Sequence, residues 1–167
     1  MRIRALVMLL STLFWPRTVL CSDKKPSTSA SDLSVCQVLS RLTKLRDKVV
    51  TVNGFLYAST EIVAIGGLNC SDPFRTGKYV WPTALSVRST ATLTDLDREC
   101  VAIRSNIGRR VRVTLTGTLR TMKKYTVIQT DAGPRGLGFG HLGLYPAELD
   151  VAEVTSIEVL EPGSTRQ

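Results

Sequence analysis

One pattern occurs twice in this chain, 63 residues apart, as Val50-Thr51-Val52-Asn53-Gly54-Phe55-Leu56 and as Val113-Thr114-Leu115-Thr116-Gly117-Thr118-Leu119. Apolar residues occupy every second position, which is typical of a half-buried β-strand. In both copies a glycine falls two residues after the second apolar residue, and glycine inside such a pattern indicates a bulge or sharp bend. Strands that curl to close a small barrel need such bends. The pair of stretches therefore predicts a barrel.

The segments around these two strands supply the other elements. Ser34 is suited to cap a short helix, whose apolar residues would be Val35, Val38, Leu39, Leu42 and Leu45. Thr94 is suited to cap a longer helix that ends at Gly108. The strands are predicted at 49–58, 61–65, 79–87, 110–120 and 149–160, with a hairpin arm that returns from the fourth strand as 125–130 and a glycine-rich loop at 131–146.

This order of elements predicts the fold class. Three strands, a helix, a strand with a hairpin arm and a final strand follow the order of the OB-fold, a five-stranded Greek-key barrel that is closed or partly open. An SH3-like barrel would lack the long helix, and a sandwich would need more strands. We predict one mostly β, OB-fold-like domain at 34–161, with one helix before strand one and one between strands three and four.

The first 21 residues differ from the rest of the chain. Arg2 and Arg4 precede an apolar stretch of about eleven residues, which fits a secretory signal peptide better than a membrane span of about twenty, although an uncleaved anchor is the alternative. We predict cleavage near Cys21, a flexible polar linker at 22–33 and a disordered tail at 162–167. The mature protein would be secreted or periplasmic, and no later segment is long and apolar enough to cross a membrane.

The charge of the chain is unevenly distributed. Its 22 basic and 14 acidic residues give a formal net charge of +8, and loss of residues 1–21 would remove three arginines and no acid. Basic residues concentrate at 101–135, and acidic residues follow them in the last strand. This favours charge pairing across the sheet over the alternative, a basic patch for nucleic acid or an anionic glycan.

Three cysteines would remain after cleavage. A disulfide between Cys36 and Cys70 would join the first helix to the end of strand two, while Cys100 lies on the apolar face of the second helix and is expected to be a buried free thiol. Other pairings stay open, because a sequence cannot define connectivity. A zinc site from these thiols and His141 is disfavoured because no two ligands have the local spacing of a zinc motif. No metal and no cofactor are predicted.

The segment Gly138-Phe139-Gly140-His141-Leu142-Gly143 matches the letters of the dinucleotide-binding motif G-x-G-x-x-G. That motif works by placing pyrophosphate at the N-terminus of a helix, and here a strand follows instead. The segment is therefore interpreted as a loop that needs positive φ angles. His141 is the only histidine, and no nucleophile motif accompanies it, so no catalytic residue is predicted.

Aromatic side chains give the candidate ligand site. OB-folds bind ligands across strands two and three, between the one–two and four–five loops. Tyr79 and Trp81 share one face of strand three, and the glycine-rich loop carries Phe139, His141 and Arg135. These five residues are the predicted ligand contacts, and the alternative is that strand three points its aromatic side chains into the core.

Three features occur together in this chain: Val35, Cys36 and Leu39 in the first helix, the glycine-bent first strand, and the segment from Gly140 to Leu149. In these features the chain resembles uncharacterised small secreted or periplasmic bacterial proteins with an OB-like domain, and the resemblance covers 34–160. It implies the fold and the compartment, and it implies no activity.

Three functions are consistent with the sequence. The leading hypothesis is an exported, non-enzymatic OB-like module that binds an unknown glycan, protein or, less readily in an exported protein, nucleic acid. The second is a structural or assembly protein that pairs through a sheet edge or the basic hairpin. The third is a hydrolase-like enzyme that uses His141.

Overall fold

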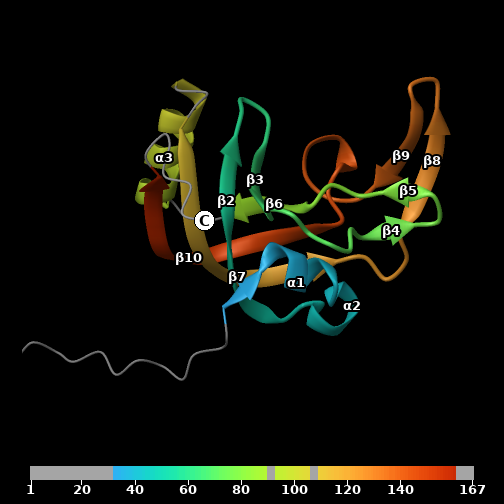
Figure 1. Ribbon diagram of the computed structural model, residues 1–167, viewed down its shortest axis with the longest axis horizontal. Helices are drawn as coiled ribbons and strands as arrows, with labels where there is room; N and C mark the ends of the chain where they lie inside the picture. The colour runs from blue at the N-terminus through green and yellow to red at the C-terminus, as the bar shows by residue number, and fades with distance from the viewer. Residues whose placement is uncertain (1–31, 90–92, 106–108, 161–167) are drawn as a thin grey trace, which may run out of the picture.

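The main sheet closes on itself. The computed structural model describes residues 32–89, 93–105 and 109–160, shown in Figure 1. Five strands follow one another around the barrel: β2 (Val49–Ala58), β3 (Val63–Gly66), β6 (Ala84–Ser89), β10 (Ala147–Leu160) and β7 (Arg110–Thr121), with β7 paired back to β2. The pairing of β6 with β10 is parallel, and the other four pairings of the barrel are antiparallel. With α3 (Thr94–Ser105) between β6 and β7 along the chain, this is the predicted OB-like barrel.

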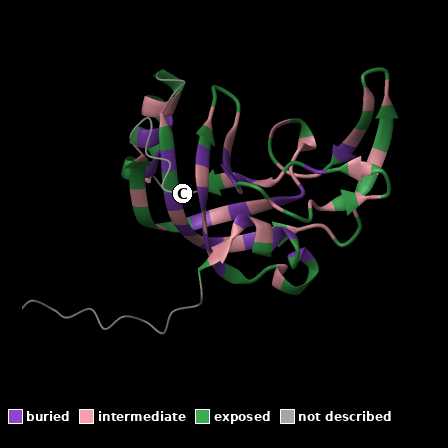
Figure 2. Ribbon diagram, viewed as in Figure 1, coloured by how far each residue is buried: buried purple, intermediate pink, exposed green. Residues whose placement is uncertain are grey.

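The two strands of the repeated pattern lie side by side, with Val52 opposite Leu115. Their alternate residues are buried in the core, as Figure 2 shows along β2 and β7. A Cβ at Gly54 would overlap the carbonyl oxygen of Gly66, and a Cβ at Gly117 would overlap that of Asp150. Both glycines therefore allow a neighbouring strand to approach where the sheet curls.

Helices cover both ends of the barrel. At the end of β7 the hydroxyl of Thr121 donates to the carbonyl of Leu42 in α2 (Leu42–Leu45), at 3.4 Å. At the start of β7, Arg109 donates to Glu99 of α3 at 2.7 Å. Leu96 and Cys100 of α3 are buried in the core.

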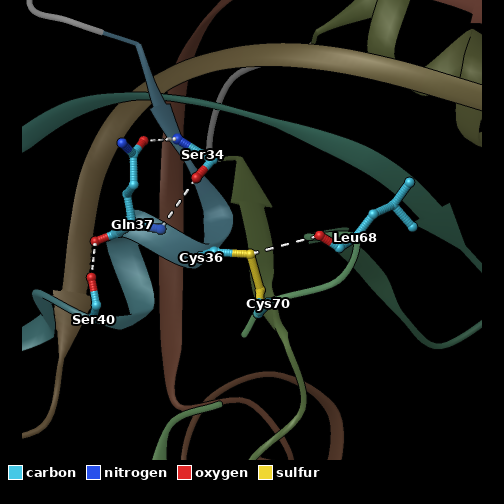
Figure 3. The surroundings of a disulfide bond; sticks show 6 residues. All are labelled: Ser34, Cys36, Gln37, Ser40, Leu68 and Cys70. Atoms are coloured by element: carbon cyan, nitrogen blue, oxygen red, sulfur yellow. Dashed lines mark hydrogen bonds between the residues drawn. A yellow bond between two sulfur atoms is a disulfide. The ribbon is translucent and has the colours of Figure 1, made fainter. Parts of the chain in front are cut away.

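The first predicted helix is divided in two, α1 (Val35–Leu39) and α2. Ser34 caps α1 as predicted, and it exchanges hydrogen bonds with Gln37 in a capping box (Figure 3). Arg41 has non-helical backbone angles, φ −128° and ψ 19°. The hydroxyl of Ser40 donates to the carbonyl of Gln37 at 3.0 Å, a bond that favours a turn here over a continuous helix.

The predicted disulfide is present. Cys36 of α1 is bonded to Cys70, which follows β3 (Figure 3). The carbonyl oxygen of Leu68 lies 3.9 Å from the Cys36 sulfur, and because that sulfur carries no proton the two atoms are only in contact. Cys100 is a buried free thiol, as predicted.

Two small hairpins form an arm beside the barrel, away from α3 (Figure 1). The first joins β4 (Arg75–Thr76) to β5 (Tyr79–Val80), and the second joins β8 (Thr126–Thr130) to β9 (Gly133–Leu137). The prediction that 125–130 returns along the fourth strand is wrong, because β7 already has β2 and β10 on its two edges. The predicted loop 131–146 instead supplies β9 as the partner of β8.

The third predicted strand is also interrupted. Residues 79–87 were expected to form one strand, but β5 ends at Val80 and β6 begins at Ala84. Pro82 lies in the gap and has no backbone N–H to donate to a ladder. The interruption lets β5 join the arm while β6 joins the barrel.

Charge pairing across the sheet is confirmed. Asp150 of β10 accepts from Arg88 of β6 at 3.3 Å and from Arg120 of β7 at 2.9 Å. Arg112 of β7 pairs with Glu158 of β10 at 3.3 Å. Basic β7 and acidic β10 therefore complement each other.

The predicted signal peptide, the linker up to residue 31 and the tail lie outside the described residues. Leu33 was predicted to be part of the flexible linker, but it forms β1 with Ser34 and pairs parallel to β2. Its partly buried side chain packs on the core. None of the helices in the described ranges is long and apolar enough to span a membrane.

Candidate functional site

The outward face of β2, β3 and β6 forms the floor of a groove. Opposite residues on neighbouring antiparallel strands share a face, and Ala64 lies opposite Ser86 while Gly66 lies opposite Ala84. Ala64, Gly66 and Ala84 form the floor of the groove, while Ser86 is buried beneath the loop at Gly140. A cavity of about 950 Å³ lies over the part of the floor that Ala64, Gly66 and Ala84 line.

Aromatic side chains stand on both sides of this floor. Tyr57 lies opposite Ala64 and is 49% exposed; its ring covers Gly66, where a Cβ would overlap it. Tyr145 lines the groove from the loop before β10. Burial raises the pKa of Tyr145, so its hydroxyl remains protonated near neutral pH. Flat rings beside a floor of small residues suit the faces of sugars or bases.

One end of the groove is basic. Arg104, Arg109 and Arg110 line it, and Arg109 is paired with Glu99. Within the described ranges neither Arg104 nor Arg110 has a carboxylate within 4.0 Å. The guanidinium of Arg110 lies 5.4 Å from the centre of the Phe55 ring, a cation–π contact between the paired strands β7 and β2.

Two loops meet beside the groove. Nε2 of His141, in the loop before β10, lies 3.2 Å from the carboxylate of Glu61, in the loop between β2 and β3. These are the four–five and one–two loops of the barrel, so this contact connects the segments expected to border an OB-fold ligand site. No Ser, Thr or Cys side chain of the described residues is hydrogen-bonded to His141, so the contact lacks a nucleophile of the kind that a catalytic triad uses.

The backbone of the glycine-rich loop is bonded within the loop. The N–H of Gly138 donates to Gly143 at 2.7 Å, and Phe139 and Tyr145 bond each other in both directions. Gly140 and Gly143 have positive φ angles, as predicted. These bonds fold the segment back on itself as a loop, and β10 follows it.

The five predicted ligand contacts do not lie together in the structure. Trp81 is 1% exposed, so its prediction as a surface contact is wrong. Its ring packs against Phe74, Tyr79 and Tyr125, and its indole N–H donates to Thr76 at 2.9 Å.

Tyr79 is partly buried against Trp81. Arg135 donates to the carbonyl of Leu142 and so supports the loop. Phe139 and His141 are in that same loop, where Phe139 pairs with Tyr145 and His141 contacts Glu61; neither lines the groove.

Tyr57 and Tyr145, which line the groove, were not among the predicted contacts. A signal for Tyr57 was available, because even positions of the strand 49–58 are apolar and odd positions must then face outward. The small residues of the floor gave no comparable signal, since only the register of three strands brings them together.

The described residues contain no group of three His, Cys, Asp or Glu side chains placed to hold a metal ion. Cys36 and Cys70 are joined to each other. Burial raises the pKa of the Cys100 thiol, which lowers its reactivity at neutral pH.

Comparisons of this chain with protein-family models, with curated proteins and with solved structures found no match.

Proposed function

We propose that this protein is an exported binding module that holds an extended ligand in the groove across β2, β3 and β6. One observation carries the proposal: a floor of small residues lies between Tyr57 and Tyr145, with Arg104 and Arg110 at one end. Rings of the ligand would lie against the tyrosines, and an anionic group would reach the arginines. The disulfide agrees with export, because disulfides persist in oxidising compartments.

Binding to an array of oligosaccharides, single-stranded oligonucleotides and peptides, measured over a series of salt concentrations, tests the proposal. Tyr57→Ala is expected to weaken binding of the retained probe about tenfold or more, the loss of one stacking contact. Arg104→Ala is expected to weaken binding of anionic probes, while its matched control Arg98→Ala, an exposed arginine of the same helix that is absent from the groove lining, leaves binding unchanged.

Binding that is insensitive to both Tyr57→Ala and Arg104→Ala would contradict the proposal. If no probe binds and the protein associates with itself through a sheet edge, the assembly hypothesis replaces it.

A further inference from the structure

The groove does not end at Phe55. A second hollow of about 680 Å³ lies over β2, β7 and β10, and it shares Phe55 and the segment Gly66–Leu68 with the first. Arg110 and Arg112 both lie over the Phe55 ring, at 5.4 and 5.5 Å from its centre. The two hollows are therefore neighbours along one face, with two guanidinium groups where they meet.

Three rows of side chains cross this part of the sheet. In the first row, Thr51 and Thr116 share a hydrogen bond at 2.9 Å, and Thr116 and Thr155 lie 3.3 Å apart. In the last row, the Phe55 ring carries Arg112, which pairs with Glu158. Within each of these two outer rows, the side chains thus contact one another.

The middle row differs from both. Asn53 lies opposite Thr114, and Thr114 lies opposite Ser156. All three line the second hollow, and none of these side chains is hydrogen-bonded to another part of the chain that the structure describes. An amide and two hydroxyls offer donors and acceptors together, so the row matches a ligand whose own groups both donate and accept.

The charges limit what that ligand is. Single-stranded nucleic acid carries a phosphate at every residue and needs a basic groove along its whole length. Here the second hollow contains Glu158 beside Arg112, and Arg104 and Arg110 are confined to the first hollow. This pattern suits a chain with many hydroxyl groups and few negative charges.

We propose, on the basis of the proposed function, that the two hollows form one site for an acidic oligosaccharide, whose hydroxyl groups bond Asn53, Thr114 and Ser156. One sugar ring lies against Tyr57, and a carboxylate or sulfate of the chain reaches Arg110. The row of Asn53, Thr114 and Ser156 selects a polyhydroxylated ligand over a nucleic acid.

Calorimetric titration of the protein with uronate-containing, sialylated and sulfated oligosaccharides, and with oligothymidylate of similar length, tests this inference. We expect an acidic oligosaccharide to bind, and Asn53→Ala and Thr114→Val each to weaken it about fivefold to tenfold by removing one hydrogen bond. The matched control is Thr116→Val, one row away on the same strand, which is expected to change the affinity less than about twofold because its hydroxyl is bonded to other threonines.

Different failures have different meanings. Oligothymidylate binding that depends on Tyr57, with no oligosaccharide bound, would overturn the inference and leave the proposed function standing. Oligosaccharide binding that is unaffected by Asn53→Ala and Thr114→Val would also overturn it. If none of these probes binds below about 1 mM, the inference is wrong and the proposed function then depends on the peptide probes alone.

Discussion

At the scale of single residues, two glycines allow Trp81 to be buried. A Cβ on Gly136 would overlap three atoms of the Trp81 ring, and a Cβ on Gly138 would overlap the Cζ3 atom of the same ring. The indole can therefore pack directly on the backbone of β9. The glycines of this segment predicted a loop, and two of them instead make room for an aromatic ring more than fifty residues away in sequence.

Gly136→Ala is expected to lower the free energy of unfolding by about 1–3 kcal/mol, because the added methyl group overpacks the site. Chemical denaturation followed by circular dichroism measures this change. Gly77→Ala is a suitable control, since a Cβ at Gly77 meets nothing within 4 Å and only its φ of +59° opposes alanine, at a cost of about 1 kcal/mol. Equal stability of Gly136→Ala and the unchanged protein would show that Trp81 is not held against β9.

At the scale of elements, the disulfide attaches α1 to the segment after β3. The two cysteines are 34 residues apart, and a closed loop of this length lowers the entropy of the unfolded chain by an amount that corresponds to about 3–4 kcal/mol. Gly67 lies against both sulfurs and lines both hollows of the proposed site. The bond therefore supports one wall of the groove.

Reduction of the disulfide, or the double substitution Cys36→Ser and Cys70→Ser, is expected to lower the free energy of unfolding by about 3–4 kcal/mol. Denaturation with and without a reducing agent checks this. Cys100→Ala serves as the control because Cys100 is a free thiol; that variant should respond to the reducing agent as fully as the unchanged protein. A denaturation midpoint that is the same in both conditions would contradict the expectation.

The sequence patterns predicted where the helices and strands lie better than which strands pair with each other. The alternation at 49–58 matches the bounds of β2, and the capping residue Ser34 is where it was expected. A hairpin arm was predicted at 125–130, but its pairing was not, because the two hairpins of the arm meet through Trp81 and Tyr125, whose rings lie 5.5 Å apart. Local propensity carries no information about such a distant contact.

At the scale of the whole molecule, Asp150 connects three strands of the closed barrel. Partial burial raises its pKa, but the hydrogen bonds and positive charges of Arg88 and Arg120 together outweigh burial and hold the pKa below its ordinary value. A carboxylate with a lowered pKa in the folded state stabilises the protein fully above its unfolded pKa of about 4. That contribution is lost as the pH falls through the lowered folded pKa.

Asp150→Asn is therefore expected to be less stable than the unchanged protein by about 1–2 kcal/mol near pH 7. The difference should shrink below about pH 4 and vanish in stronger acid, as thermal denaturation over a pH series can show. Glu158→Gln, which alters a pair whose side chains are 51% and 59% exposed, should change stability little. A stability difference for Asp150→Asn that does not depend on pH would contradict the role assigned to its charge.

The groove is also a property of the whole barrel, because it forms only when β2, β3 and β6 lie in register. The groove lies across β2, β3 and β6, while Trp81, a predicted contact, is buried. The choice of Trp81 assumed that side chains alternate between two faces all along 79–87. Pro82 interrupts that strand, and the residues on its two sides belong to different sheets. Tyr57 lies on an uninterrupted strand, where the alternation of side chains correctly places it on the outward face.

The burial of Trp81 has a practical consequence. Trp15 and Trp81 are the two tryptophans of the chain, so a protein that begins at residue 22 contains Trp81 alone. Its intrinsic fluorescence then reports on the arm, separately from the far-ultraviolet signal of the barrel strands. A red shift in emission that precedes loss of the β-sheet signal during denaturation would reveal that the arm opens before the barrel unfolds.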